Sequence, residues 1–309
     1  MQILLTGSSG VVGTYVLLHL LKEGHKVIAV DRIPLPPTTL TSLQGTYQDL
    51  DDILKVEVVD LTSIGEVISL FSRYTSPPDD TPSKSSSIDG VIHLAAIPHP
   101  EGNDARFVHN TNTSISYNVL YTAAEHGIRR IVQASSVNFT GLAYTRKGMQ
   151  RFDKLPIDED EPSHAEDPYA LSKQICEIQA LSLCRLHPSL TIASLRFHHV
   201  LPTLAQAVEW SREEEFWMWT SSLSAAQACI MGLTTPQEGR WKGHEAFNIV
   251  APEIAWRDAT AGSLELLGKS EWNDEGRIGL VDREWWEGGR RRGFWDCTKA
   301  ERLLGWRHV

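Results

Sequence analysis

The chain has 309 residues, of which 41% are apolar, and its formal net charge is −10 with a sequence pI near 5.6. This length allows a large hydrophobic core and one or two lobes. The acidic balance disfavours a nucleic-acid or anionic-membrane partner, and no basic run offsets it. No apolar stretch reaches the length of a membrane span, and residues 2–5 have the pattern of a core strand, not of a signal peptide.

Cysteine usage bears on the compartment and on metal binding. The chain has four cysteines, and their spacing shows no paired metal motif. We therefore expect reduced thiols, no metal site and a soluble, cytoplasmic protein. The four residues are Cys176, Cys184, Cys229 and Cys297.

A glycine-rich turn follows the first predicted strand, residues 2–5. Gly7 permits a tight turn, Gly10 lets the backbone approach a pyrophosphate, and Gly13 lets the following helix pack close to the strand. The N-terminus of that helix directs positive charge at phosphates. The pattern therefore predicts a dinucleotide-binding turn, and an ordinary strand-to-helix turn is the alternative. Further candidate contacts with the cofactor in this turn are Ser9, Val11 and Val12.

The second and third predicted strands, residues 26–30 and 54–59, end in residues suited to the adenosine half of a dinucleotide. Asp31 can accept hydrogen bonds from a ribose and repels a 2′-phosphate, which favours NAD. Its neighbour Arg32 could hold that phosphate, so NADP remains open. Asp60, beside Leu61, could bind the adenine amino group or cap the next helix.

Small residues end the fourth predicted strand, residues 90–96, where backbone must pass close to a cofactor. The candidate contacts there are Leu94, Ala95 and Ala96. His93 lies within this strand and is expected to be a core histidine, whereas His99, in the stiff loop beyond it, could face a substrate.

The fifth predicted strand, residues 130–134, leads into two serines. Ser136 can donate a hydrogen bond to a substrate oxygen, and Ser135 is expected to be a turn former. The acidic run at residues 158–161 is expected to be a solvated loop and not a catalytic pair of carboxylates. Residues 75–87, a low-complexity segment, are expected to form a surface loop.

The helix that begins after Asp167 carries the strongest chemical pattern. Asp167 can cap the helix and Pro168 suits its first position. Tyr169 and Lys173 are four residues apart and therefore lie on one helix face. An ammonium one turn from a phenol lowers the pKa of the tyrosine towards neutrality, which makes it a proton donor and acceptor for a hydroxyl or carbonyl substrate.

A sixth predicted strand, residues 191–196, leads into adjacent histidines. His198 and His199 would point in opposite directions in an extended segment, so a shared metal is disfavoured. One of them could face the nicotinamide end of a cleft. All ten tryptophans fall between Trp210 and Trp306, and we place the boundary of a second lobe near residue 200.

In order and spacing, these motifs resemble the extended short-chain dehydrogenase/reductases, nearest to their NAD-dependent epimerase/dehydratase group. Supporting segments are HLAA at 93–96, NTSISYN at 112–118, SSVNFTG at 135–141, GHEAFNIVAPE at 243–253 and TKAERLLGW at 298–306. One departure is Ile115, where the family usually has glycine. The resemblance implies an α/β fold: a Rossmann doubly wound parallel sheet in residues 1–200 and a smaller substrate lobe in residues 201–309, interleaved with the end of the sheet.

The resemblance also implies roles for individual residues. Tyr169 would be the general acid/base, Lys173 would bind the nicotinamide ribose and tune Tyr169, Ser136 would position the reacting oxygen, and Asn112 would help to order the site. A homodimer formed through the helices of Asn112 and Tyr169 is the family expectation. Further candidate contacts are Phe197 and His199 for the cofactor, and Val137, Asn138 and His198 for the substrate.

The second lobe suggests a substrate class. Residues 202–220 are acidic and aromatic, and acidic side chains beside a diphosphate would repel it. The lobe therefore looks like that of family members acting on small non-nucleotide substrates, such as uronate dehydrogenases. Trp217 and Trp219 could share a face towards the cleft, although core packing is the default for tryptophan.

The sequence leaves three functions open. The leading one is an NAD-dependent dehydrogenase or reductase of a small, aromatic or sugar-like compound. The second is an epimerase, of a sugar or sugar nucleotide, that retains its cofactor. The third is a redox-sensing NAD(P)-binding protein without turnover, which would not need Ser136, Tyr169 and Lys173 together.

Overall fold

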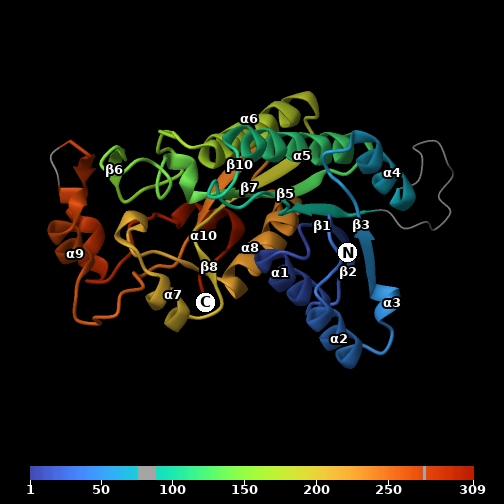
Figure 1. Ribbon diagram of the computed structural model, residues 1–309, viewed down its shortest axis with the longest axis horizontal. Helices are drawn as coiled ribbons and strands as arrows, with labels where there is room; N and C mark the ends of the chain where they lie inside the picture. Colours follow the sequence, from blue (N-terminus) through green and yellow to red (C-terminus); the bar gives the residue numbers. More distant parts are fainter. Residues whose placement is uncertain (76–87, 274–275) are drawn as a thin grey trace.

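The computed structural model describes residues 1–75, 88–273 and 276–309. Its centre is a seven-stranded sheet with the order β10-β7-β5-β4-β1-β2-β3, and all neighbouring strands are parallel (Figure 1). This confirms the predicted Rossmann α/β class. The strands are β1 (Gln2–Thr6), β2 (Lys26–Asp31), β3 (Leu54–Val58), β4 (Gly90–His93), β5 (Arg130–Ser136), β7 (Thr191–Phe197) and β10 (His244–Ile249).

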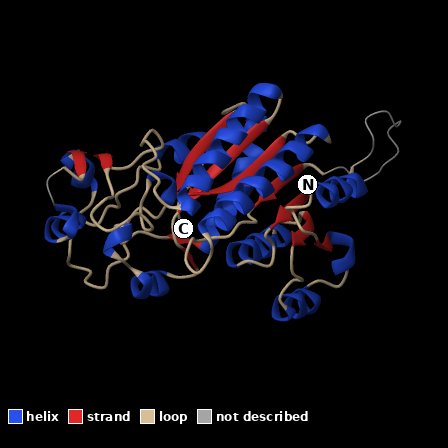
Figure 2. Ribbon diagram, turned by 45° about the horizontal axis from the view of Figure 1, so that its top comes forward, coloured by secondary structure: helices blue, strands red, loops and turns tan. Residues whose placement is uncertain are grey.

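Helices cover both faces of this sheet (Figures 1 and 2). The pair α5 (Ala105–Glu125) and α6 (Pro168–Leu186), with α4 (Ile64–Tyr74), covers one face, and α1 (Val11–Lys22) with α8 (Ser222–Thr234) covers the other. The remaining helices of the described chain are α2 (Pro37–Thr46), α3 (Leu50–Ile53), α7 (Leu204–Trp210), α9 (Ser263–Lys269) and α10 (Thr298–Leu304).

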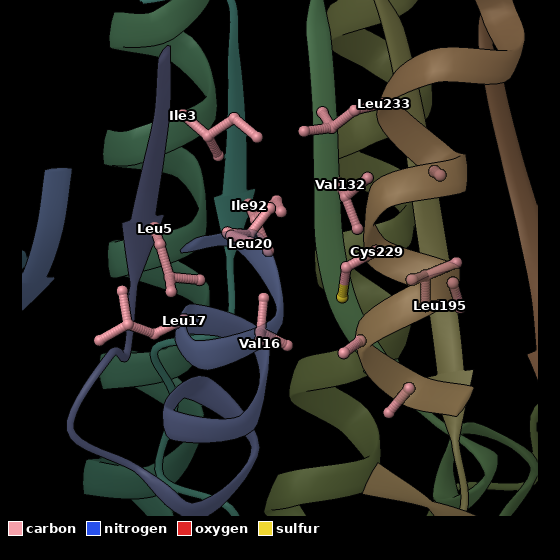
Figure 3. Close-up of a cluster of buried hydrophobic side chains, with 14 of the residues drawn as sticks. Ile3, Leu5, Val16, Leu17, Leu20, Ile92, Val132, Leu195, Cys229 and Leu233 are labelled. Carbon is pink, nitrogen blue, oxygen red and sulfur yellow. The ribbon is translucent and has the colours of Figure 1, made fainter. Parts of the chain in front are cut away.

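Alternation along the strands explains the two layers. Ile3 and Leu5 belong to the cluster on the side of α1 and α8, and Figure 3 shows Leu5 beside Leu17 of α1, whereas Leu4 packs with the α4–α5–α6 layer. Successive strand residues point to opposite faces, so a strand covered on both sides is apolar at nearly every position. Because β2 and β4 lie on either side of β1, the chain reverses its direction of winding there, which is where ligands bind in open α/β sheets.

The last third of the chain forms a lobe with little regular structure and an aromatic core. Phe216 is fully buried, and its ring stacks on Trp272 with centroids 4.3 Å apart. Phe294 and Trp295 pack against the same ring. Two small parallel sheets belong to this region, β6 (Phe152–Leu155) with β11 (Ile278–Val281) and β8 (Val200–Leu201) with β9 (Thr220–Ser221). Short 3₁₀ helices complete it: η1 (Val137–Thr140), η2 (Glu213–Glu215), η3 (Thr235–Glu238), η4 (Glu271–Asn273) and η5 (Arg283–Gly288).

The strand predictions differ from the structure mainly at strand ends. The fourth strand ends at His93 and not at residue 96, because the N–H of Ala95 donates to the side chain Oγ1 of Thr6 instead of to a strand backbone. The fifth strand extends two residues further than predicted, through Ser136. The predicted loop at residues 75–87 lies, after Thr75, outside the described residues.

The chain after residue 200 does not stay within the lobe. It returns to the sheet as β10, which pairs with β7, and as α8, which packs on α1. The division of the chain into two domains near residue 200 therefore stays a prediction. Within the described ranges, no helix combines the length and apolar character that crossing a bilayer requires.

Candidate active site

A cavity of about 840 Å³ lies at the carboxyl ends of the central strands. Its walls come from the start of α1, the segments that come after β4, β5 and β7, the start of α6, and the lobe. It brings together many of the residues selected from the sequence: Val11, Val12, Leu94, Ala96, His99, Ser136, Val137, Asn138, Tyr169, Lys173, Phe197, His198 and His199.

The start of α6 fixes the direction of the tyrosine and lysine. Asp167 Oδ1 accepts from the N–H of Tyr169 at 2.9 Å and from the N–H of Ala170 at 2.8 Å, and Pro168 is the first helical residue. The predicted cap is confirmed, since these contacts satisfy backbone donors that the helix leaves free. Tyr169 and Lys173 therefore both line the cavity from one helix face.

Three polar side chains converge at the inner end of the cavity. Ser136 Oγ accepts from the N–H of Asn138 at 3.1 Å, which leaves its proton free for Tyr169. Lys173 Nζ donates to the carbonyl of Ala134 at 2.8 Å and lies 5.5 Å from the centroid of the Tyr169 ring. A hydroxyl or carbonyl beside Tyr169 would thus have a proton donor, a second hydrogen-bond donor and a cation at hand.

The expected lowering of the tyrosine pKa is wrong for this structure. Burial raises the pKa of Tyr169 to about 12, and the hydrogen bond from Ser136 opposes that rise only in part. Burial also lowers the pKa of the Lys173 ammonium. Desolvation disfavours the charged phenolate, and the negative charge of Asp167 raises the pKa of Tyr169 further. Tyr169 is therefore a neutral phenol at neutral pH and is ready to donate a proton.

Asn112 orders the loop that leaves the end of β4. Its Oδ1 accepts from the N–H of Ile97 at 2.8 Å, and its Nδ2 donates to the carbonyl of Ile97 at 3.1 Å and to Ser172 Oγ at 3.1 Å. It therefore joins α5, the loop and α6 beside the cavity. This position agrees with the ordering role that the resemblance implies.

The glycine turn has the shape that a dinucleotide needs. A Cβ atom on Gly13 would lie 1.9 Å from the carbonyl oxygen of Gly7, and a Cβ on Gly7 would lie 2.6 Å from the amide nitrogen of Ala95. Gly7 also has φ +73°, which L side chains rarely adopt. The first residue before α1 is Gly10, which offers no side-chain cap, so the amides at the helix start remain free for phosphate oxygens. These features fit NAD or NADP.

The candidates for the adenosine half lie beyond the cavity, at the ends of β1, β2 and β3. Asp31 Oδ2 accepts from the N–H of Ser9 at 3.0 Å, which joins β2 to the glycine turn, while Arg32 is exposed. Asp60 accepts from both the N–H and the hydroxyl of Thr62, at 2.9 and 2.8 Å. It does not cap α4, whose first turn is capped by Ser63. Leu61 is buried in the core on the α4 side.

Two polar residues beside the cavity have structural partners. His93 Nδ1 lies 2.7 Å from Thr6 Oγ1, and burial lowers the pKa of His93 to about 3, so it is the neutral core histidine that was expected. Ser135 is not a turn former. It lies in β5, is buried, and donates to Glu177 Oε1 at 2.5 Å.

His198 is held in one tautomer. Its Nδ1 accepts from the N–H of His199 at 2.8 Å, so its Nε2 carries the proton and donates to the carbonyl of Glu215 at 3.2 Å. Burial lowers the pKa of His198 to about 3, which keeps the ring neutral. His199 points elsewhere, with its ring 5.7 Å from that of Trp210. The adjacent histidines thus share no ligand position.

Part of the cavity wall was not identified from the sequence. It is acidic and aromatic, and burial raises the pKa of Glu215 to about 7. The only sequence signal was the composition of residues 202–220, because no motif marks single positions there. The residues of this wall, here called the outer wall, are Glu101, Tyr144, Trp210, Arg212, Glu214 and Glu215.

Core packing, the default expected for tryptophan, holds for Trp217 and Trp219, and the alternative that they face the cleft is wrong. Trp217 and Trp219 do not share a face towards the cavity: Trp217 is buried in the aromatic core of the lobe, and Trp219 packs in a separate cluster. The period-two argument fails because Phe216 and Trp217 have left-handed φ angles of 51° and 56°, which break the extended chain. The acidic loop at residues 158–161 is also not solvated throughout, since Glu161 is buried.

Comparison with known proteins assigns the chain to a class of NAD-using α/β enzymes. The model of the NAD dependent epimerase/dehydratase family matches residues 3–207. The chain belongs to this family, as the sequence motifs predicted, and NAD is the cofactor of the family.

Individual relatives are distant. The chain is 26% identical over 202 residues to a dTDP-6-deoxy-L-talose 4-dehydrogenase (NAD(+)) of Aggregatibacter actinomycetemcomitans, covering 65% of this chain and 62% of that protein. It is 27% identical over 205 residues to a UDP-glucose 4-epimerase of Drosophila melanogaster, covering 63% and 52%. The chain thus spans little more than half the length of these curated relatives. A solved structure of a mutated uronate dehydrogenase shares the fold, with a TM-score of 0.61 and 20% identity over 100% of this chain and 81% of the other.

Proposed function

We propose that the protein is an NAD-dependent oxidoreductase that acts on a hydroxyl or carbonyl carbon of a small non-nucleotide substrate. The observation that carries this proposal is the convergence of Ser136, Tyr169 and Lys173 at the inner end of one cavity, next to the glycine turn at the start of α1. A binding protein without turnover would not need this arrangement of a proton donor, an oxygen-binding hydroxyl and a cation.

Each of the three residues has its own part in the chemistry. Ser136 donates a hydrogen bond to the reacting oxygen, and Tyr169 transfers a proton to it during reduction or removes one during oxidation. Lys173 stabilises the negative charge that develops on the phenol and holds the end of β5 through Ala134. When it is bound, NAD supplies the nicotinamide carbon that accepts or gives the hydride.

The outer wall supports a substrate without a diphosphate. Its three carboxylates, Glu101, Glu214 and Glu215, face a single guanidinium, Arg212. A nucleotide diphosphate would bring further negative charge to this wall, and the acidic side chains there would repel it. Carboxylates beside the Trp210 and Tyr144 rings suit a polyhydroxylated, sugar-like compound, whose hydroxyls donate and whose carbon face stacks on aromatic rings.

An epimerase that retains its cofactor is the second candidate, and one observation favours it. The curated relatives of the chain include a UDP-glucose 4-epimerase. Such an enzyme would use the same three residues, with oxidation followed by reduction from the other face of the substrate.

The first test separates chemistry from binding. Tyr169→Phe keeps the ring and removes the proton donor, so turnover should fall at least a thousandfold while NADH binding, followed by fluorescence, changes less than threefold. Tyr47→Phe, at the end of α2 and outside the cavity lining, is the control and should behave like the wild type. Activity retained in Tyr169→Phe would remove the proposed function.

A second test separates the two candidates. The protein is purified without added nucleotide and denatured, and the released nucleotide is quantified. NAD near one per chain would support the epimerase, whereas a site that exchanges NADH freely would support the dehydrogenase. A screen of free sugars and sugar acids, in parallel with UDP-sugars, then identifies the substrate class.

Assembly and location extend the proposal. Apolar side chains are exposed along α5 and α6, which supports a homodimer through these helices. All four cysteines are free, which fits a reducing compartment such as the cytoplasm.

A further inference from the structure

Two of three consecutive residues at the end of β5 are hydrogen-bonded by α6, and the third lines the cavity. The carbonyl of Ala134 accepts from Lys173 Nζ at 2.8 Å, and Ser135 Oγ donates to Glu177 Oε1 at 2.5 Å. The third of them, Ser136, lines the cavity together with Tyr169. The three α6 residues are spaced by four and therefore form one stripe along the helix. Glu177 is the member of this stripe that lies outside the cavity lining.

A buried ion pair anchors the far end of the stripe. Arg196 of β7 donates to Glu177 through Nε at 3.0 Å and through Nη2 at 2.8 Å, and the side chains of Arg196 and Glu177 are 4% and 7% exposed. A two-bonded guanidinium–carboxylate pair fixes both direction and distance. Arg196 is held in turn by the carbonyl of Glu159 at 3.1 Å and by the Phe139 ring at 3.8 Å. Glu177 therefore has little freedom to move.

We propose that Ser135, Glu177 and Arg196 are positioning residues of the active site, which set the end of β5 against α6 and so hold Lys173 beside Tyr169. The inference rests on the proposed function. Ser135 lies between Ala134, which accepts from Lys173, and Ser136, which lines the cavity with Tyr169, so a shift of Ser135 would move both neighbours. Glu177 and Arg196 lie outside the cavity lining, and Ser135, which belongs to the lining, directs its hydroxyl to Glu177.

The charges around Lys173 make Glu177 the relevant partner. Burial lowers the pKa of the Lys173 ammonium, and negative charge on Cys176 or Glu177 opposes that fall. Burial raises the pKa of the Cys176 thiol and lowers the pKa of His93 to about 3, so both are uncharged at neutral pH, and Tyr169 is a neutral phenol. Arg196 is bound to Glu177 itself. Among the groups facing Lys173 from α6, β4, β5 and β7, Glu177 supplies the negative charge.

The mild test is Ser135→Ala, which removes one hydrogen bond and leaves the Glu177–Arg196 pair intact. We expect kcat to fall by about threefold to tenfold, with the Kd for NADH within twofold of the wild type, because the reacting groups move and the cofactor contacts do not. Ser194→Ala is the matched control. Ser194 is also a buried strand serine with two hydrogen-bond partners, Gln133 and His244, but it does not contact Glu177. It should keep wild-type kcat.

The second test is Glu177→Gln, with kcat followed against pH. Loss of the carboxylate lets Lys173 release its proton at lower pH, so the alkaline limb of activity should move down by about half a pH unit or more. If Glu177→Gln does not fold, the kcat of Ser135→Ala still tests the proposed positioning role. Wild-type kcat in Ser135→Ala, an equal loss in Ser194→Ala, or an unmoved alkaline limb in folded Glu177→Gln would overturn the inference. Turnover by Tyr169→Phe would instead refute the proposed function.

Discussion

Asp31 is the residue on which the choice between NAD and NADP depends. Its carboxylate stands at the end of β2 and is held by the N–H groups of Ser9 and Ile33, at 3.0 and 3.4 Å. We predict that Asp31→Ser lowers the preference for NADH over NADPH at least tenfold, because the repulsion of a 2′-phosphate is lost and Arg32 becomes available to pair with it. Fluorescence titrations with both reduced nucleotides measure the two Kd values.

The neighbouring guanidinium supplies the control for this prediction. Adding Arg32→Ala to Asp31→Ser should remove the gain for NADPH and leave NADH binding nearly unchanged. If the single variant Asp31→Ser keeps the wild-type ratio of the Kd values for NADH and NADPH, Asp31 does not select the cofactor.

The positions of the site residues were easier to predict from the sequence than their protonation states and hydrogen-bond partners. The spacing of Tyr169 and Lys173, with Asp167 as cap, identified a helix face, and the structure places both side chains in the cavity. Their protonation could not be predicted, because the pKa of Tyr169 depends on burial by elements distant in sequence. Ser135 was misjudged for the same reason: its partner, Glu177, lies 42 residues away.

At the scale of elements, regular structure was predictable from local patterns and irregular backbone was not. Alternation and glycine spacing located six strands of the sheet and the turn before α1, because each is encoded within a few residues. The outer wall is different. Glu215 enters the cavity from a single 3₁₀ turn, η2, after which two residues have left-handed φ angles, and no local pattern predicts that path.

The predicted homodimer interface consists of exposed apolar side chains on α5 and α6. On α6, Leu171, Ile178 and Leu181 are 39%, 53% and 39% exposed, and their spacing places them on one stripe. Phe107 and Tyr117 are exposed on the adjacent α5. We predict that Ile178→Lys converts a dimer of two 34.5 kDa chains into a monomer, because a charge would be buried in the interface. Light scattering after size-exclusion chromatography gives the mass.

The control for assembly is Ile68→Lys on α4, where the original side chain is 44% exposed but lies outside this stripe. It should leave the mass unchanged, and circular dichroism should show both variants folded. A wild-type protein that is monomeric at micromolar concentration would exclude the dimer from the outset.

At the scale of the whole molecule, the two halves of the chain are tied together at the edge of the sheet. The N–H of Asn248, in β10, donates to Glu159 Oε1 at 2.7 Å, and the Asn248 side chain donates to the carbonyls of Ile157 and Asp296, both at 3.3 Å. The carbonyl of Glu159 also accepts from Arg196, within the positioning network. These hydrogen bonds explain why the boundary near residue 200 does not separate two independent sheets.

Buried titratable groups make the stability of the whole molecule depend on pH in opposite directions. Burial lowers the pKa values of His93 and His198 to about 3, so their contribution is complete above pH 6.5 and is lost as the pH falls, by about 1.4 kcal/mol per pH unit for each ring. Burial raises the pKa values of Glu159 and Glu215 to about 7, so their contribution is complete below pH 4.5 and is lost as the pH rises to 7. Between pH 4.5 and 6.5 these two contributions to the free energy of unfolding therefore oppose each other.

Glu159→Gln isolates one of these contributions. The amide oxygen can still accept from Asn248, but the side chain no longer ionises. A rise of the carboxyl pKa from 4.5 to about 7 corresponds to about 3 kcal/mol that the wild type loses above pH 7 and the variant keeps. Relative to the wild type, the Tm of the variant should therefore rise by about 5 °C between pH 5 and pH 8.

Asp160→Asn, at an exposed position of the same loop, is the control, and its Tm difference from the wild type should not vary with pH. If the difference for Glu159→Gln is equally constant, Glu159 is already ionised in the folded protein at pH 5, and the tie between the two halves is an ionic one.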